Sequence, residues 1–389
     1  MKILIVGPTF YPDVNGASYF VQRLAHYLHK NGHSVLVVAP SRFIHNENYD
    51  LNGVSVFGVR SFPIFINRFR VAQSIFIKNL LRKRIKEFSP DVIHLQSHLI
   101  FSKTILKIAR ELKIPIMGTN HFMPENLLHY LHLNRKTEGH IRQFAWKDFL
   151  KVFEKLDAVT TPTETGAKLL AEIGLSKSVV PISCGIDLKI FNTQNNGEYL
   201  KEKYNLPKKQ ILLYLGRLDK EKNVDVLLRA FALSLEKIDA HFLIAGFGAE
   251  KANLEKLASK LKIKKSVTFT GFVSNEDKPN LYRVADCFAI AGIAELQSIV
   301  TMEAMASGLP IIAVNAMALP HLIKHGENGF LFQLDDIKSI SEYIVRIFSD
   351  KELKNRMSKK SLEMIKVHDI DKIIDKYELL YHKIINRQA

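Results

Sequence analysis

Short apolar runs alternate with longer amphipathic stretches along the whole chain. The runs contain mainly Val, Ile, Leu and Phe, and most end at Gly, Pro or a polar residue, as expected for buried parallel strands. In the first half the predicted strands cover residues 2–7, 34–40, 54–59, 91–97, 115–121, 158–163 and 178–185. In the second half they cover residues 211–217, 241–248, 266–272, 287–292, 310–315 and 329–332.

The stretches between these runs carry apolar residues at helical spacing. The predicted helices cover residues 17–31, 166–172, 223–235, 249–261, 276–284, 300–307 and 337–348. Strands that alternate with helices are typical of α/β folds with parallel sheets. The series starts again after a polar stretch at residues 192–210, which we expect to be a linker, so the pattern predicts two Rossmann-like domains in tandem. Ligands of such sheets bind beyond the carboxyl ends of the strands, and we expect the active site in a cleft between the domains.

The length and the cysteine count agree with this picture. A chain of 389 residues exceeds the usual size of one hydrophobic core. Cys184 and Cys287 are too few for a disulfide framework and suit a reducing compartment. The first apolar run is too short for a signal peptide, and no run reaches the roughly 20 apolar residues needed to cross a bilayer. We therefore expect a cytoplasmic protein.

The net charge of +16 is distributed unevenly. Residues 1–190 hold 25 Lys and Arg against 14 Asp and Glu, whereas the rest of the chain is closer to balance. A basic half suggests an anionic partner, either a phospholipid surface or nucleic acid. A basic surface that is merely solvated is an equally simple interpretation.

Two cations follow the first predicted strand of the second half. In LGRLDKEKN, Gly216 permits a tight exit from the strand, and Arg217 and Lys222 stand at the start of the next helix. Cations beside the free amides of a helix N-terminus form a favourable site for a diphosphate. The alternative is a solvated turn with charges of both signs.

Two carboxylates lie around the start of a short predicted helix in AELQSIVTMEAMASGLPI. Glu295 follows a strand, and Ser298 is placed to cap a helix whose first residues, Ile299 and Val300, offer free amides to a phosphate. Glu303 lies about one turn further along. Because a carboxylate accepts hydrogen bonds at two oxygens, both acids are suited to bind paired sugar hydroxyls. The alternative interpretation is that Glu303 has no ligand and only interacts favourably with the positive, amino-terminal half of the helix dipole.

These motifs resemble those of GT-B glycosyltransferases, specifically family 4. The two glutamates followed by AMASGLP are similar to the donor-binding motif of the family. YPDVNGASYFVQRLAHYLHKNGHSVLVVAP is similar to its amino-terminal glycine loop and helix, and PISCGIDLKIF, GRLDKEKNVDVLLRAF, IAGFGAEKANLEKLA and HGENGFLF resemble later blocks. The resemblance therefore spans the chain. It implies the GT-B fold, with two Rossmann-like domains whose parallel sheets face each other across a cleft.

The resemblance also implies how the chain is divided. Residues 1–187, with a carboxyl-terminal helix at residues 370–389 that returns to pack on them, form the acceptor-binding domain. Residues 188–369 form the nucleotide-sugar-binding domain. Closure of the two domains around the donor is then expected as a hinge motion.

Roles in the donor site are implied by position. Gly16 lets the backbone approach the diphosphate of the donor, and Arg217 and Lys222 neutralise that diphosphate as it leaves. Glu303 holds the ribose hydroxyls, and Glu295 holds hydroxyls of the transferred sugar near the reacting carbon. Ser298, Ile299 and Val300 complete the donor site at the helix N-terminus.

His121 in GTNHFMPEN matches the cleft histidine of the family, which contacts the sugar. The alternative is a loop histidine that only makes a hydrogen bond. With Glu295, Arg217 and Lys222 it makes up the predicted catalytic set. Asn15 stands in place of a glycine beside Gly16, and we expect the turn to survive because Asn tolerates the left-handed conformation.

Neither a metal nor another cofactor is implied. Asp369 and Asp371 have Asp-x-Asp spacing, but they fall in a predicted helix, where residues two apart diverge. Cations and helix amides would stabilise the leaving diphosphate instead. By resemblance the reaction retains the anomeric configuration. Gln297 and Ser298 stand where the family commonly has Gly-Phe or Gly-Leu, in the loop around the transferred sugar, so the identity of the sugar stays open. Cys184 stands where the family commonly has Asn.

The stretch from Asn67 to Phe88 holds seven Lys and Arg and one Glu. Ile77, Leu81 and Ile85 recur there at helical spacing with cations between them. Such a helix could lie on an anionic leaflet with its apolar stripe down and its cations at the phosphates. Alternatively, the helix could pack its apolar stripe on the first sheet and leave its basic face exposed to solvent. Packing on the sheet is the more economical use of the stripe, but the two are compatible, and we slightly favour association of this segment with a membrane.

Lipid-glycosylating members of the family carry such a basic surface, and Glu295-x-Gln297 is similar to their diacylglycerol glucosyltransferases. We therefore expect transfer of a hexose, with UDP-glucose as the first choice of donor, to a lipid such as diacylglycerol at the inner face of the cell membrane. Within the family, the alternative acceptor is a polysaccharide or a polyprenyl-linked glycan.

Outside the family, the alternatives are a basic nucleic-acid-binding protein and a non-catalytic nucleotide-sugar-binding protein. An NAD-dependent enzyme would need G-x-G-x-x-G after the first strand, which is missing.

Overall fold

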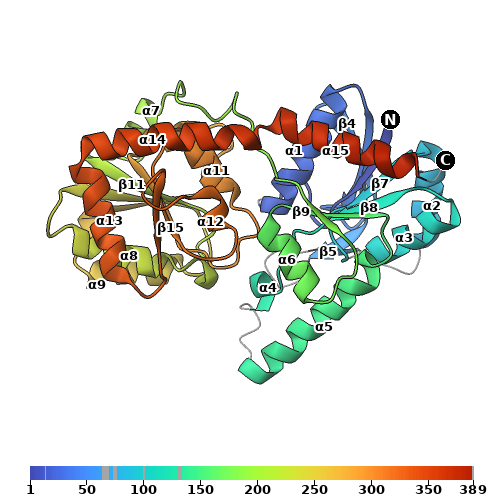
Figure 1. Cartoon of the computed structure of the whole chain (residues 1–389), viewed down its shortest axis with the longest axis horizontal. Helices are drawn as coiled ribbons and strands as arrows, with labels where there is room; N and C mark the ends of the chain where they lie inside the picture. Colours follow the sequence, from blue (N-terminus) through green and yellow to red (C-terminus); the bar gives the residue numbers. More distant parts are fainter. Residues whose placement is uncertain (14, 64–69, 73–76, 100, 129–133, 388–389) are drawn as a thin grey trace. The chain divides into compact units, whose positions relative to one another are not determined.

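The structure is a computed structural model, and it describes all residues except 14, 64–69, 73–76, 100, 129–133 and 388–389. The chain divides into two compact units. Unit 1 comprises Met1–Cys184 and Asp371–Ala389, and unit 2 comprises Gly185–Ile370. Each unit contains one large, mainly parallel sheet with helices packed on it, so the predicted α/β class is confirmed (Figure 1).

The sheet of unit 1 has eight strands in the order β10-β9-β8-β7-β1-β2-β4-β3. Their bounds are β1 Lys2–Val6, β2 Ser34–Pro40, β3 Glu47–Leu51, β4 Val54–Val59, β7 Val92–Leu95, β8 Ile116–Thr119, β9 Ala158–Thr161 and β10 Val179–Pro181. Only β3 is antiparallel to its neighbour, β4, among these strands. A separate antiparallel pair contains β5 (Ser61–Pro63) and β6 (Arg70–Ala72). The sequence did not predict β3, β5 or β6, because short edge strands have no continuous apolar run.

The helices of unit 1 are α1 Gly16–Lys30, α2 Ile77–Phe88, α3 Ser102–Glu111, α4 Glu125–Leu128, α5 Arg135–Phe153, α6 Glu164–Glu172 and α15 Ile370–Ile385. The helix α1 buries Phe20, Leu24 and Leu28, which recur at helical spacing. Its N-cap is Asn15, whose side chain accepts a hydrogen bond from the Ser18 amide over 2.9 Å. Asn15 has an extended backbone with φ of −152°. The turn therefore does not use the left-handed conformation that was expected of this residue.

The apolar stripe of α2 lies in the core of unit 1. Ile77, Leu81 and Ile85 are buried there, and Phe88 is partly buried against the same cluster. Of the two placements left open for this stripe, packing on the sheet is therefore confirmed and contact with a membrane is excluded, because the core already covers the stripe. An amphipathic helix buries its apolar stripe equally well in a protein core. The basic face stays exposed at Lys78, and residues 67–69 and 73–76 of the predicted membrane segment lie outside the described part.

The helix α15 packs on unit 1 although it is the last helix of the chain. The Glu378 carboxylate accepts a hydrogen bond from the side chain of Asn31, at the end of α1, over 2.9 Å. The ring of His94 in β7 bridges the Tyr381 hydroxyl at 2.8 Å and the Thr119 hydroxyl at 2.7 Å. Burial lowers the pKa of His94 to about 3, so the imidazole is neutral in this bridge. Figure 1 shows α15 beside α1.

The sheet of unit 2 has six parallel strands in the order β13-β12-β11-β14-β15-β16. Their bounds are β11 Gln210–Leu215, β12 Ala240–Ala245, β13 Val267–Gly271, β14 Cys287–Ile290, β15 Ile311–Val314 and β16 Gly329–Phe332. Counted from β11, the order is 3-2-1-4-5-6, as in dinucleotide-binding Rossmann domains. After β11 the chain adds β12 and β13 on one side of the sheet, and after β14 it adds β15 and β16 on the other side. The strand order therefore reverses between the neighbours β11 and β14, and their carboxyl ends lie at this switch point.

The helices of unit 2 are α7 Glu198–Lys203, α8 Val224–Ser234, α9 Lys251–Lys260, α10 Lys278–Arg283, α11 Ile299–Ala306, α12 Leu319–Leu322, α13 Ile337–Ser349 and α14 Lys351–Ile365. Short 3-10 helices are η2 Lys220–Lys222, η3 Lys264–Ser266 and η4 Lys366–His368. The stretch 192–210, expected as a linker, contains α7 and lies inside unit 2. In the described part of the chain, no helix is both long enough and apolar enough to cross a bilayer.

Candidate functional site

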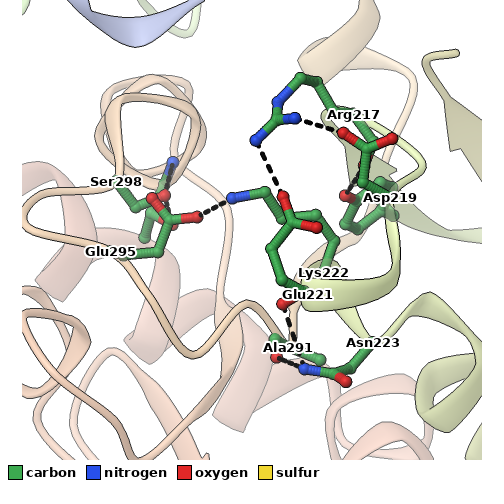
Figure 2. Close-up of polar contacts among 10 residues, drawn as sticks. Arg217, Asp219, Glu221, Lys222, Asn223, Ala291, Glu295 and Ser298 are labelled. Carbon is green, nitrogen blue, oxygen red and sulfur yellow. Dashed lines mark hydrogen bonds and ion pairs between the residues drawn. The ribbon is translucent and has the colours of Figure 1, made fainter. Parts of the chain in front are cut away.

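Two loops meet at the switch point of unit 2. The first follows β11 and contains Lys222, and the second follows β14 and contains Glu295. The ammonium nitrogen of Lys222 lies 2.7 Å from Oε1 of Glu295. The Asn223 side chain donates to the Ala291 carbonyl over 3.0 Å, which ties the same loops together a second time (Figure 2). The structure thus brings together a cation and an acid that the sequence proposed separately.

Glycines let these loops approach closely. A Cβ atom at Gly292 would lie 3.0 Å from Oε1 of Glu295 and 3.3 Å from Cδ of Lys222, so a side chain there would crowd the ion pair. A Cβ atom at Gly246 would lie 1.8 Å from the Gly216 carbonyl oxygen, a distance that no side chain permits. The loops after β11 and β12 therefore pack backbone against backbone, and Gly246 is required there.

Two carboxylates hold the side chain of Arg217. One guanidinium nitrogen pairs with Asp219, and the other lies 2.8 Å from Oε1 of Glu221. Both acidic side chains are only 7% exposed, whereas the Arg217 side chain is 23% exposed. Figure 2 shows the guanidinium spanning the two acids. The two ion pairs hold the guanidinium group in one orientation, whereas an unpaired arginine side chain would sample several. The alternating charges of RLDKEK were the signal for these partners, and neither acid was among the predicted site residues.

The helix α11 begins as its sequence predicted. Ser298 is the N-cap, and its hydroxyl accepts hydrogen bonds from the Thr301 amide at 3.4 Å and the Thr301 hydroxyl at 2.8 Å. Ile299 and Val300 are the first two helical residues, whose amides have no acceptor one turn back within the helix. This end of the helix follows Glu295 directly, so positive amide dipoles lie near the ion pair.

Glu303 lies inside α11 and is 1% exposed. Its Oε1 lies 2.7 Å from the Lys278 ammonium, and its Oε2 accepts the Tyr282 hydroxyl hydrogen bond over 2.7 Å. Burial and the adjacent Glu303 carboxylate hold the pKa of Tyr282 well above its usual range, so the phenol remains a donor. Lys278 also lies 5.3 Å from the ring centre of Phe191. Lys278 and Tyr282 were missed, since nothing in the local pattern of α10 indicates their partner.

Gly16 and His121 belong to unit 1. Gly16 is the first residue of α1. His121 follows β8, and its Nε2 lies 3.1 Å from Oε1 of Gln96, which follows the neighbouring strand β7. Burial lowers the pKa of His121 to about 4, so the ring is neutral. The Gln96 oxygen can only accept, so Nε2 carries the proton and Nδ1 is the acceptor. Gln96 was not among the predicted site residues.

Within the described residues, no group of three or more His, Cys, Asp or Glu is arranged to hold a metal ion. Asp369 forms a β-bridge with Ile186, and Asp371 lies in the first turn of α15. Only Asp371 of the two is therefore helical, which corrects the predicted placement of Asp369.

Two family models match the chain. The model described as "Glycosyl transferases group 1" matches residues 197–364, and "Glycosyltransferase Family 4" matches residues 14–190. An alpha-monoglucosyldiacylglycerol synthase of Streptococcus pneumoniae (strain ATCC BAA-255 / R6) is 30% identical over 340 residues, which cover 85% of this chain and 75% of that protein. A protein of the same name from Acholeplasma laidlawii is 25% identical over 398 residues, covering 100% of this chain and 98% of that one.

Among solved structures, sucrose-phosphate synthase from Thermosynechococcus elongatus superposes with a TM-score of 0.81. The two sequences are 19% identical, and the match covers 100% of both chains. At this identity the likeness concerns the fold, which the two proteins share.

Proposed function

The chain belongs to the group 1 and family 4 glycosyltransferases and has their GT-B class of fold, and from this premise we propose that it transfers a hexose from a nucleotide sugar to a membrane lipid. The proposed donor is UDP-glucose and the proposed acceptor is diacylglycerol. The two relatives named alpha-monoglucosyldiacylglycerol synthase support this choice of lipid and sugar.

The observation that carries the proposal is the pairing of Lys222 with Glu295 at the switch point of unit 2. An ammonium group has three N–H donors, so Lys222 can hold Glu295 and a phosphate oxygen at the same time. Arg217, directed by two carboxylates, is the second cation for the diphosphate. The amides of Ile299 and Val300 offer further donors. These groups suit a ligand that has an anionic end and a hydroxylated end.

In the proposed reaction, the bond between the anomeric carbon and the diphosphate oxygen breaks as the lipid hydroxyl forms the new bond on the same face of the sugar. The departing phosphate takes the proton of that hydroxyl, and configuration is retained. Lys222, Arg217 and the helix amides stabilise the negative charge that develops on the diphosphate, in the role that a metal ion plays elsewhere. We propose that no metal is needed for this step.

The remaining roles follow the family motif. Glu295 accepts hydrogen bonds from the transferred sugar, and Glu303 accepts them from the ribose. Both oxygens of Glu303 already have partners, but a carboxylate has about four acceptor positions, so the ribose can add to Lys278 and Tyr282 rather than replace them. His121 contacts the sugar and Gly16 the diphosphate. A neutral His121 with Nδ1 as acceptor suits a sugar hydroxyl.

The basic face of α2 is proposed as one contact with anionic lipid at the inner face of the cell membrane. Lys78, Lys83 and Lys86 are exposed on it. Each such cation near an anionic surface contributes about 1 kcal/mol. Because the apolar stripe of α2 is buried, this contact is electrostatic and should weaken with salt.

The proposal is tested by incubating the purified protein with radiolabelled UDP-glucose and anionic vesicles that contain diacylglycerol. The expected product is a labelled glucolipid, formed in the presence of EDTA. Parallel reactions contain UDP-galactose, GDP-mannose, a polyprenyl-linked glycan or a polysaccharide. Transfer only to a glycan would replace the lipid acceptor in the proposal. A protein that binds nucleotide sugars but neither transfers nor hydrolyses them would contradict an enzymatic function.

A further inference from the structure

Three large apolar side chains are exposed on two segments of unit 1, one that follows β2 and one that follows β4. Phe43 and Ile44 follow β2 and are 45% and 63% exposed, and Phe62 in β5 is 38% exposed. Single exposed apolar residues are common on soluble proteins, whereas a contiguous group marks a surface that meets a partner. These three side chains can act together only if the segments that carry them are neighbours in the fold.

Hydrogen bonds hold the two segments side by side. The Ser41 amide donates to the Val59 carbonyl over 2.7 Å, and the Ser61 amide donates to the Phe43 carbonyl over 3.4 Å. The Ser61 hydroxyl donates to the Ser41 carbonyl over 2.5 Å. Since β2 and β4 are parallel neighbours, both segments leave the same carboxyl edge of the sheet. The three exposed side chains therefore lie on adjacent segments.

Each of the two phenylalanine rings has an arginine side chain beside it. The Arg42 guanidinium lies 5.5 Å from the ring centre of Phe43, and that of Arg60 lies 5.3 Å from the ring centre of Phe62. The His45 ring stacks on Phe43 with 5.0 Å between the ring centres. Arg42, His45 and Arg60 are all exposed. Glu47, the first residue of β3, accepts hydrogen bonds from the Ser41 hydroxyl at 2.9 Å and from the Arg42 amide at 3.2 Å.

We propose that Arg42, Phe43, Ile44, His45, Arg60 and Phe62, the aromatic–arginine patch, dock unit 1 on an anionic phospholipid surface. Apolar side chains of this size enter the boundary between headgroups and acyl chains. Arginine at the same depth pairs with lipid phosphates, often through two hydrogen bonds. The patch supplies the apolar part of a membrane contact that α2 lacks, because the stripe of α2 is buried in the core.

A nucleic acid fits the same surface less well. Single-stranded nucleic acids bind by stacking bases on the faces of aromatic rings. Here the Phe43 ring is already in contact with the His45 ring and the Arg42 guanidinium, and the Phe62 ring is in contact with the Arg60 guanidinium. Ile44, the most exposed of the three apolar side chains, has no aromatic face to offer a base. An aliphatic side chain among cations matches a lipid surface.

The test is flotation of the full chain with vesicles of phosphatidylglycerol and phosphatidylcholine, and with vesicles of phosphatidylcholine alone. Replacing Phe43, Ile44 and Phe62 together by Ser should weaken binding to the mixed vesicles about tenfold or more. The double variant Arg42→Gln/Arg60→Gln should weaken it about 25-fold at low salt, about fivefold for each charge. Little binding of the wild type to neutral vesicles is expected.

Matched controls separate the patch from a general loss of apolar surface or charge. Leu379→Ser removes a side chain that is 70% exposed on α15, and Lys107→Gln/Lys168→Gln removes two exposed charges from α3 and α6. Both controls should bind vesicles within about twofold of the wild type. If the patch variants float as well as these controls, the inference is wrong. Binding of an oligonucleotide that depends on the patch, without vesicle binding, would also overturn it.

The inference rests on the proposed function only for the lipid acceptor, and the two can fail separately. Transfer of glucose to diacylglycerol dispersed in detergent is measured on the same variants and should be unchanged, because docking is then not needed. Patch-dependent flotation without any transfer to diacylglycerol would support the inference and contradict the acceptor. Transfer in detergent with flotation that ignores the patch would contradict the inference and support the acceptor.

Discussion

The ammonium nitrogen of Lys222 lies 2.7 Å from Oε1 of Glu295, although the two residues follow different strands of unit 2. Their strands, β11 and β14, are hydrogen-bonded neighbours that end at the same edge of the sheet. The contact therefore depends on topology, which brings a cation and a carboxylate together at one edge of the sheet.

Lys222→Met should lower kcat/KM for the nucleotide sugar by about 100-fold or more, because one donor to the developing diphosphate charge is lost. The pair is partly exposed, so the free energy of unfolding should change by only about 1 kcal/mol. Steady-state kinetics and urea unfolding measure the two effects. Lys220→Met, two residues away and exposed, is the matched control and should keep its activity.

Asp219→Asn and Glu221→Gln should act through Arg217. Each variant frees one side of the guanidinium, so KM for the donor should rise about tenfold while the fold is kept. Lysine in place of Arg217 should not restore activity, since an ammonium group cannot span both acids. A KM equal to that of the wild type in both acid variants would show that Arg217 needs no such orientation.

Lys278→Met should destabilise unit 2 by about 3 kcal/mol, because it leaves the Glu303 carboxylate buried without its cation. The double variant Lys278→Met/Glu303→Gln should recover most of this loss, as the remaining amide is neutral and can still accept from Tyr282. Urea unfolding of the wild type, Lys278→Met, Glu303→Gln and the double variant completes the cycle. Lys203→Met breaks the pair between an exposed lysine and Asp277 and should destabilise the protein much less than Lys278→Met does.

Stability should fall as the pH is lowered below about 6.5. Burial lowers the pKa of His94 to about 3, against an ordinary value of 6.5 in the unfolded chain. Between these values the unfolded chain binds the extra proton, so acid favours unfolding and the full stability is present only above pH 6.5. Each such histidine contributes a slope of about 1.4 kcal/mol per pH unit.

The variant His94→Gln tests this pH dependence, with unfolding followed from pH 7.5 to pH 5. The loss of stability over this range should be smaller than in the wild type, whatever the change at pH 7.5. His140→Gln, at an exposed position on α5, is the control and should leave the slope unchanged. Equal slopes for the wild type and His94→Gln would mean that His94 does not titrate as described.

Much of the fold could be predicted because buried parallel strands leave a simple mark in the sequence. Runs such as KILIV are almost entirely apolar, since both faces of the strand are covered. The antiparallel strand β3 could not be found in this way, because ENYDL lies at an edge and remains partly solvated. Membership of family 4, predicted from the motifs, is confirmed by the matches to the two halves of the chain.

The candidate site was only partly within reach of the sequence. Lys222 and Glu295 were found because the carboxyl ends of parallel strands share an edge. Lys278 was not, since its contact with Glu303 depends on how α10 packs beside α11, and no local pattern carries that information. The sequence could not decide between a membrane and the sheet as the partner of the α2 stripe, because Ile77, Leu81 and Ile85 have the same spacing in both cases.

The central claim is that Lys222 and Arg217 hold the diphosphate of the donor, and calorimetric titration with UDP tests it most directly. The wild type and Lys220→Met should bind UDP equally, and Lys222→Met and Arg217→Met should each bind it about tenfold or more weakly. Uridine, which has no phosphate, should bind all four proteins alike. If UDP bound to Lys222→Met and Arg217→Met as tightly as to the wild type, the diphosphate would lie elsewhere and the account would be contradicted.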